Sequence, residues 1–338
     1  MLRPAAGQIN GCGADMTDDA SREGASARPD RSNGPAGLRV VLFGGAGFIG
    51  RHAQAALLEG GARVVVCDRP GTEDGALPGA SHRAIAFEDP DTYCDALDGA
   101  DALVLLVSAS VPGTYANDLA AEIEANVVPY ARLVQGLRDR GERGSAVPHL
   151  VYLSSGGTVY GAAGSGAIRE DAPLRAISPY GIGKMGIEGL IRAAPGTHTI
   201  LRPSNPVGPG QDGRRGQGIV ATVLDLAARG EPVPIWGDGL AVRDYFDVRD
   251  LADAIARAVA LPAALGQTFN VGSGVGRTTL DVLGEIEAVL GRAVAREFRP
   301  TRAVDVPSNV LDIQLIGSTV GWRPRHSLRK SIGDMVSG

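Results

Sequence analysis

The chain has 338 residues, of which 44% are hydrophobic, and a formal net charge of -5. This length suffices for about two domains, or for one large α/β domain with an attached lobe. The mild acidity offers no basic surface to a polyanion, so nucleic acid is not expected as a partner. Cys12, Cys67 and Cys94 are scattered and odd in number. They argue against a disulfide framework and a metal cluster, and they indicate a reducing cytoplasm.

The N-terminal segment differs from the rest of the chain. Residues 1–36 are rich in Gly, Ala, Asp, Ser and Arg and show no periodicity, which predicts a disordered tail. No basic segment followed by an apolar stretch precedes the folded part, and no apolar run approaches the roughly 18 residues that cross a bilayer. We therefore expect neither secretion nor a membrane span.

From Leu38 onward, short β-branched runs alternate with stretches of helical length. Runs that are apolar on both faces predict a parallel sheet with helices on both sides, so the fold class is α/β and doubly wound. The runs are, in chain order, LRVVLFG, RVVVCD, RAIAFE, ALVLLVS, HLVYLSS, HTILRP and QTFNVG.

The first strand runs directly into GGAGFIG, which contains Gly44, Gly47 and Gly50, and then into a helical stretch. A strand, a glycine loop and a helix in that order let backbone amides approach a pyrophosphate at the helix N-terminus, as in Rossmann-type folds. The plainer alternative is a tight turn that binds no ligand.

Two acidic residues follow the next strands. Asp68 ends RVVVCD, close to the offset at which an acid binds the adenosine ribose, although an Asp at a strand end is often only a turn former. Its carboxylate would repel a 2′-phosphate, which favours NAD over NADP, whereas the neighbouring Arg69 softens that repulsion. Asp89 lies where an acid contacts adenine or, equally well, caps a helix.

The segment SPYGIGK places Tyr180 and Lys184 four residues apart, on one face of a helix. A nearby ammonium and an oxidised nicotinamide both favour the phenolate, so Tyr180 could remove a proton from a hydroxyl as hydride leaves the same carbon. Because the chain has only two lysines, a chance Lys four places after a Tyr has a probability of roughly 0.04. Upstream, LSSGGTVYG brings the hydroxyls of Ser154, Ser155 and Thr158 to the carboxyl edge of the sheet, where one of them could bond the reacting oxygen.

After about Arg202 the chain loosens into Gly/Pro-rich loops with helical stretches near 218–229, 278–291 and 310–320. We expect a smaller C-terminal substrate-binding lobe there, made of 201–243 and 273–334. Residues 37–200, together with about 244–272, would form the cofactor-binding domain.

Several motifs in this order resemble the extended short-chain dehydrogenase/reductase family. The resemblance covers about residues 38 to 334, and it is strongest to the NAD-dependent nucleotide-sugar epimerases of the UDP-glucose 4-epimerase type. The motifs are GGAGFIG, LSSGGTVYG, YGIGK, LRPSNPVGPGQ, IWGDGLAVRDYFDVRDLADAI, FNVGSG and DVPSNVLDIQLIGSTVGWRP.

The resemblance implies NAD as the cofactor. It makes Asp68 the ribose ligand, Tyr180 the catalytic base, and Lys184 the residue that modulates this base and binds the nicotinamide ribose. The loop residues that would bind the cofactor are Gly44, Gly47, Phe48, Ile49 and Gly50.

The resemblance also implies a nucleotide-sugar substrate and a homodimer. Asn205 matches a position that contacts the sugar nucleotide, and Arg243 and Arg302 match positions that contact its diphosphate, which suits a guanidinium fork. A surface ion pair of Arg243 with Asp244 or Asp247 is the alternative. Asn309 matches the position that gates the sugar pocket, and because Asn is small we predict tolerance of N-acetylhexosamines.

Two departures from the family pattern matter. Gly156 stands where many relatives carry the third catalytic hydroxyl, so Ser155, Thr158 or a water must replace it. Gly157 and Thr158 stand where 4,6-dehydratases carry an Asp-Glu pair, which argues against dehydration. The histidines show no zinc-ligand spacing, so no metal is expected.

The sequence thus predicts 4-epimerisation of a UDP-hexose through a 4-keto sugar. A nucleotide-sugar oxidoreductase or decarboxylase on the same scaffold remains an alternative. A catalytically weak NAD-binding regulatory protein is another, because of Gly156.

Overall fold

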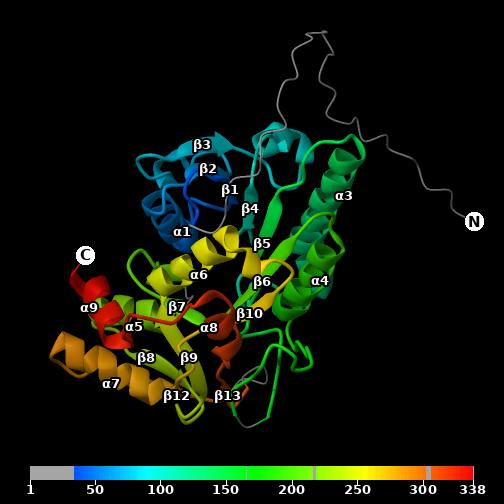
Figure 1. The fold of residues 1–338 in the computed structure, drawn as a ribbon. Coiled ribbons are helices and arrows are strands. Elements are labelled where there is room, and N and C mark those ends of the chain that lie inside the picture. The colour runs from blue at the N-terminus through cyan, green and yellow to red at the C-terminus, as the bar shows by residue number, and fades with distance from the viewer. Residues whose placement is uncertain (1–33, 165, 216–217, 302–305, 338) are drawn as a thin grey trace, which may run out of the picture.

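The computed structural model describes residues 34–164, 166–215, 218–301 and 306–337 (Figure 1). Residues 1–33 of the expected tail therefore lie outside the described residues. Within these ranges the main element is a parallel sheet of seven strands in the order β10-β6-β5-β4-β1-β2-β3, which confirms the doubly wound α/β fold. Its strands are β1 (Arg39–Phe43), β2 (Arg63–Asp68), β3 (Ser81–Ala84), β4 (Ala102–Leu105), β5 (His149–Leu153), β6 (His198–Pro203) and β10 (Thr268–Val271).

Both faces of this sheet are buried because its strands are apolar at successive positions. Side chains alternate between the faces of a strand. In β1, Val40 and Leu42 enter one core cluster, while Val41 and Phe43 enter the other. The near-continuous apolar runs of the sequence are therefore what a sheet with two covered faces requires.

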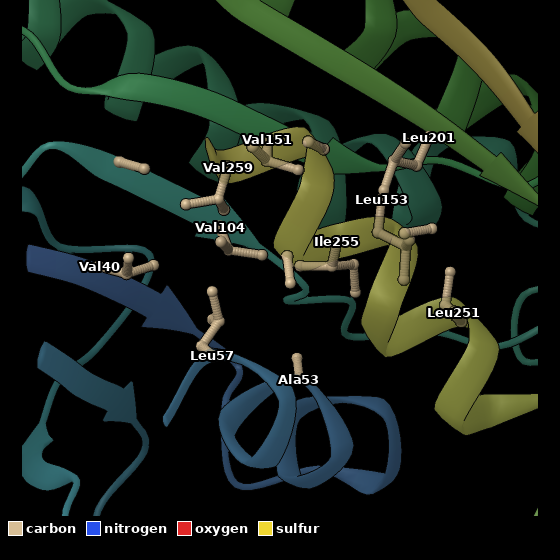
Figure 2. Packing of buried hydrophobic residues seen from close by; sticks show 14 of the residues in the cluster. Val40, Ala53, Leu57, Val104, Val151, Leu153, Leu201, Leu251, Ile255 and Val259 are labelled. Carbon is tan, nitrogen blue, oxygen red and sulfur yellow. The ribbon is translucent and has the colours of Figure 1, made fainter. Parts of the chain in front are cut away.

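One face is covered by α1 (Phe48–Glu59) and α6 (Val248–Ala260), which pack against each other. The helix α6 is capped by Asp247, whose side chain accepts a hydrogen bond from the amide of Arg249. Although α6 comes late in the chain, its apolar stripe belongs to the core of this layer. Figure 2 shows that core, with Val40, Ala53, Leu57, Val104, Val151, Leu153, Leu201, Leu251, Ile255 and Val259.

The opposite face carries α3 (Val128–Glu142) and α4 (Pro179–Ala193), which lie side by side in Figure 1. Their apolar residues share a core with edge-to-face aromatic pairs, including Tyr130 with Tyr152 at 5.5 Å between ring centroids. A short helix α2 (Leu119–Glu122) and a π-helical turn (Ile123–Val127) lead into α3. This layer carries the SPYGIGK segment on α4.

A second region contains two smaller sheets in the described part of the chain. Strand β9 (Val242–Asp247) pairs with β7 (Asn205–Val207), β11 (Gly276–Thr278) and β13 (Ser308–Asn309), while β8 (Val233–Trp236) pairs with β12 (Arg296–Arg299). The helices that share its core are α5 (Ile219–Arg229), α7 (Thr279–Leu290) and α9 (Leu328–Ser337).

The chain passes between the two regions several times. It leaves the large sheet after β6 and returns through α6 and β10, as the QTFNVG run predicted. The helix α8 (Gln314–Val320) then contacts β10. No helix among the described residues is long and apolar enough to cross a membrane. The remaining one-turn 3₁₀ segments are Glu73–Gly75, Pro90–Thr92, Cys94–Leu97, Gly213–Arg215 and Pro262–Ala264.

Candidate active site

The candidate site lies outside the carboxyl ends of β1 and β4. These neighbouring strands continue in opposite directions, β1 toward β2 and β4 toward β5, so their ends form a topological switch point. Gly44 has a φ of 80°, and a Cβ atom there would lie 3.0 Å from the backbone nitrogen of Val107 after β4. Only glycine combines this backbone conformation with this close approach.

The glycine loop fits a dinucleotide pyrophosphate. Gly50 has no room for a side chain, since a Cβ atom there would lie 2.3 Å from the carbonyl oxygen of Gly45. Gly47, in contrast, has a φ of -74°. A Cβ atom there would lie 3.6 Å from the carbonyl oxygen of Gly44, which is an ordinary van der Waals contact. Gly47 caps α1 without a side chain, and α1 continues through Phe48 and Ile49. The exposed helix N-terminus beside Gly47 therefore has the form of an anion cradle.

Asp68 and Asp89, both expected near the adenosine, differ in position. The Asp68 carboxylate accepts hydrogen bonds of 2.9 Å from the amides of Ala46 and Arg69, so it is fixed beside the glycine loop. It keeps further lone pairs for a ribose hydroxyl. The exposed Asp89 carboxylate accepts a hydrogen bond from the amide of Asp91 and caps the 3₁₀ turn Pro90–Thr92, which is the alternative that the sequence left open.

Helix α4 brings Tyr180 and Lys184 together. Ser178 caps the helix through the amide of Gly181, and Pro179 occupies its first position, where the missing N–H costs nothing. The Lys184 Nζ atom lies 5.6 Å from the centroid of the Tyr180 ring and donates a hydrogen bond of 3.2 Å to the carbonyl of Leu153 at the end of β5. The pair thus lies at the carboxyl edge of the sheet.

Burial acts on both members of the pair. It lowers the pKa of Lys184 from 10.5 to about 8, although the carboxylates of Glu122 and Glu188 raise it. It raises the pKa of Tyr180 well above 10.0, and the charge of Glu122 raises it further. Tyr180 is partly exposed at the surface of the site, so a ligand can reach it. The sequence predicted that the Lys184 ammonium and an oxidised nicotinamide favour the phenolate. With the protein's own groups alone, the net pKa of Tyr180 is raised instead.

A second set of buried charges lies under the pair and was missed from the sequence. Glu188 is completely buried and forms an ion pair of 2.7 Å with Arg202. It also accepts a hydrogen bond of 2.6 Å from Ser154. Burial alone raises the pKa of Glu188, but hydrogen bonds from Arg202 and Ser154 and the charge of Arg202 outweigh it, so the net pKa is lowered. The signal was available, because Glu188 follows Lys184 by four residues and so shares its helix face.

The loop after β5 carries Gly156 and Thr158, which have different surroundings. A Cβ atom at Gly156 would lie 2.6 Å from Leu311 Cδ1 and 2.8 Å from the carbonyl oxygen of Arg202, so no serine fits there. The Thr158 Oγ1 atom is buried and has no hydrogen-bond partner among the described residues. The Thr158 backbone oxygen would lie 2.9 Å from a Cβ atom at Gly181, so Thr158 packs directly against the helix turn of Tyr180.

Asn309 lies against the same loop. It is completely buried on β13, and its Nδ2 atom donates a hydrogen bond of 3.1 Å to the carbonyl of Gly156. Its Oδ1 atom is buried without a hydrogen-bond partner in the described part of the chain.

The other predicted substrate residues lie on the second region. The Asn205 side chain, on β7, donates a hydrogen bond of 2.8 Å to the carbonyl of Asp244. The Arg243 guanidinium, on β9, donates hydrogen bonds to the carbonyls of Val242 and Val306 at 2.9 and 2.8 Å. Arg302 lies outside the described residues. Within the described residues, no group of three or more His, Cys, Asp or Glu side chains is arranged to hold a metal ion.

Comparison with known proteins decides the family. A model of the NAD dependent epimerase/dehydratase family matches residues 40–272. The chain belongs to this family. The UDP-glucose 4-epimerase of Mycolicibacterium smegmatis is 32% identical over 320 residues, which cover 88% of this chain and 97% of that protein. The UDP-glucose 4-epimerase of Azospirillum brasilense is also 32% identical, over 85% of this chain and 88% of that protein.

Solved structures agree with this assignment. UDP-glucose 4-epimerase of Thermotoga maritima with UDP-glucose superposes with a TM-score of 0.80 at 27% identity, over 89% of this chain and 98% of that one. UDP-glucose 4-epimerase of Thermus thermophilus with NAD gives the same TM-score and coverage at 28% identity. A dTDP-glucose 4,6-dehydratase of Streptomyces venezuelae with NAD also has this fold, with a TM-score of 0.79 at 26% identity, over 89% of this chain and 96% of that one. The scaffold therefore serves more than one reaction, and residues of the site must distinguish them.

Proposed function

We propose that the chain is an NAD-dependent nucleotide-sugar epimerase that inverts C4 of a UDP-hexose through a transient 4-keto sugar. The observation that carries the proposal is that the Tyr180 and Lys184 pair, anchored at the end of β5, and the glycine loop after β1 lie at the same carboxyl edge of one parallel sheet. NAD fits this site because no side chain caps the N-terminal amides of α1. At Gly47 there is also free space where a side chain would otherwise stand. Relatives named UDP-glucose 4-epimerase match almost their whole length.

The residues of the site divide the chemistry between them. NAD, when bound, supplies the hydride acceptor and a positive nicotinamide. Tyr180 removes the proton of the sugar 4-hydroxyl and later returns it to the inverted oxygen. Lys184, whose pKa of about 8 keeps it charged at neutral pH, stabilises the phenolate and donates to the ribose. Asp68 holds the adenosine ribose.

We assign to Thr158 the role of the hydroxyl that many relatives carry at the position of Gly156. Ser155 supplies the neighbouring hydroxyl. The orphaned, buried Thr158 Oγ1 atom beside the turn of Tyr180 supports this choice. Asn205 and Arg243 would bind the sugar nucleotide, and Asn309 would face the sugar. The absence of the Asp-Glu pair at Gly157 and Thr158 argues against dehydration, the reaction of the Streptomyces neighbour.

We further propose how the molecule is divided. Residues 37–200 with 244–272 would form the cofactor-binding domain, and 201–243 with 273–334 would form the substrate-binding lobe. The return of α6 and β10 to the large sheet supports this division, although the first residues of 201–243 belong to β6. A homodimer is also proposed from the family resemblance, and light scattering on the purified protein tests the oligomeric state. A cytoplasmic location is proposed from the scattered cysteines.

The test is incubation of the NAD-saturated protein with a panel of UDP- and GDP-sugars, with the products resolved by NMR. We expect UDP-glucose and UDP-galactose to interconvert without accumulation of NADH. A substrate deuterated at C4 should keep its label at C4 in the product, because the same hydride leaves and returns.

Other outcomes would assign other functions. Stoichiometric NADH indicates a net oxidoreductase, and release of carbon dioxide from a UDP-uronate indicates a decarboxylase. NAD binding without turnover of any sugar indicates a regulatory protein.

A further inference from the structure

A buried carboxylate lies beside the Tyr180 and Lys184 pair without a role in the mechanism given above. Glu122 ends α2, immediately before the π-helical turn Ile123–Val127, and only 1% of its surface is exposed. Its Oε1 atom accepts a hydrogen bond of 3.0 Å from Asn126, while its Oε2 atom has no partner among the described residues. Burying such a group is costly unless a nearby positive charge compensates it.

The carboxylate is packed against the backbone of α4. A Cβ atom at Gly183 would lie 2.7 Å from Glu122 Oε1 and 3.1 Å from its Cγ, so the Glu122 side chain occupies the space beside Gly183. Gly183 lies between Tyr180 and Lys184 on that helix. π-helical turns are frequent at functional sites, where they change the direction of a side chain.

We propose that Glu122 is a positioning residue whose buried carboxylate acts as the counter-ion of Lys184 and so fixes the charge state of the Tyr180 and Lys184 pair. This inference rests on the proposed function in one respect, namely that Tyr180 and Lys184 are the catalytic pair. Asn126 would hold the carboxylate in place, because its amide also accepts a hydrogen bond of 2.8 Å from Ala109 after β4.

The electrostatic surroundings give the direction of the effect. The charge of Glu122 raises the pKa of Lys184 against burial, and it also raises the pKa of Tyr180. The other titratable groups around it are Tyr152 on β5, whose pKa burial and neighbouring charges raise, and Glu188 on α4. Removing the negative charge of Glu122 should therefore lower the pKa of both members of the pair.

Lysine titration by NMR measures this directly, because Lys184 and Lys330 are the only lysines of the chain. In NAD-saturated protein with labelled lysine, we expect Glu122→Gln to lower the pKa of Lys184 by on the order of 1 unit, the scale of one close opposite charge. The exposed Lys330 serves as an internal reference and should not change. Glu124→Gln is the matched control, since it removes an exposed carboxylate from the π-helical turn that follows Glu122 and should leave Lys184 unchanged.

The pH profile of turnover provides a second readout. Its two limbs should report the coupled titration of Tyr180 and Lys184 in the NAD-saturated protein. Because both pKa values fall, Glu122→Gln should move both limbs to lower pH. A uniform loss of rate without this displacement would mean that Glu122 is merely structural.

The proposal is overturned if the pKa of Lys184 is the same in the wild type and in folded Glu122→Gln protein. If the glutamine variant fails to fold, Glu122→Met replaces it, because methionine has a similar length and no polar group to satisfy. A chain that converts no nucleotide sugar would refute the proposed function, yet the lysine titration would still test the counter-ion.

Discussion

The glycine loop after β1 and the hydroxyl loop after β5 lie at the same edge of the large sheet, but they are built differently. Around the glycine loop, backbone geometry dominates: Gly44 and Gly50 are fixed by contacts with backbone atoms, and α1 offers its amide end. Around the hydroxyl loop, buried charged side chains dominate, namely Glu122, Lys184 and the Glu188 ion pair.

The two loops differ because one binds a pyrophosphate and the other takes part in a proton transfer. A pyrophosphate keeps its charge, so it can be bound by a rigid cradle of amides and a helix dipole. A proton transfer needs a group whose charge changes, so its surroundings must contain other charges that set the pKa. Each prediction below alters one of these regions and leaves the other intact, in order of decreasing expected effect.

Glu188→Gln should destabilise the protein by about 3–5 kcal/mol, because it leaves Arg202 buried without its counter-ion. Urea unfolding of the wild type and the variant measures the difference. Arg192→Gln is the control: Arg192 binds the same carboxylate at 3.0 Å, but 41% of its side chain is exposed. Its loss should cost at most about 1 kcal/mol. Equal costs for the two variants would contradict the role of burial.

Gly50→Ala and Gly47→Ala should separate folding from cofactor binding in the glycine loop. At Gly50 the new methyl meets the carbonyl of Gly45, which should cost about 1–3 kcal/mol of stability as well as NAD affinity. At Gly47 the methyl meets no close protein atom, so stability should change by less than about 0.5 kcal/mol. NAD affinity should nevertheless fall about tenfold or more, because the methyl occupies the anion cradle. Unchanged NAD affinity in Gly47→Ala would place the pyrophosphate elsewhere.

Gly156→Ser restores the hydroxyl that many relatives carry, yet we expect it to lower stability by about 1–3 kcal/mol, because its Cβ atom meets the carbonyl of Arg202. Turnover should not increase. Thr158→Val, which keeps the shape and removes the hydroxyl, should lower turnover instead. If Gly156→Ser were stable and faster than the wild type, Thr158 would not be the replacement.

Asp68→Ala should have the smallest effect, a change of about tenfold in the ratio of NAD to NADP dissociation constants, through loss of repulsion toward the 2′-phosphate. Calorimetry with both cofactors measures the two constants. Wild-type protein that binds NADP as tightly as NAD would show that Arg69 overrides the carboxylate.

The two regions were also unequally predictable from the sequence. The glycine loop is a local pattern, so GGAGFIG predicted both its backbone and its position at the sheet edge. Tyr180 and Lys184 were also predicted, because they are spaced along one helix face. The second region and the return of β10 followed from composition and from one apolar run.

Spacing could have indicated that Glu188 shares the helix face of Lys184, but it could not indicate what the buried carboxylates contact, because those contacts are distant in the sequence. Glu122 meets α4 at Gly183, 61 positions later, and Arg202 lies on β6, whereas Glu188 lies on α4. Nor did the sequence reveal that Gly156 has no room for a side chain, since the obstructing atoms belong to Leu311 and Arg202. Such contacts depend on tertiary packing, which no local spacing contains.

The most direct test of the account is turnover of Tyr180→Phe on the UDP-sugar identified by the panel. This change removes one oxygen and little volume, so the fold and NAD affinity should be preserved. Turnover should fall by about 10²-fold or more, the scale for loss of a positioned acid and base. A folded, NAD-loaded Tyr180→Phe protein that epimerises at the wild-type rate would show that Tyr180 is not the base.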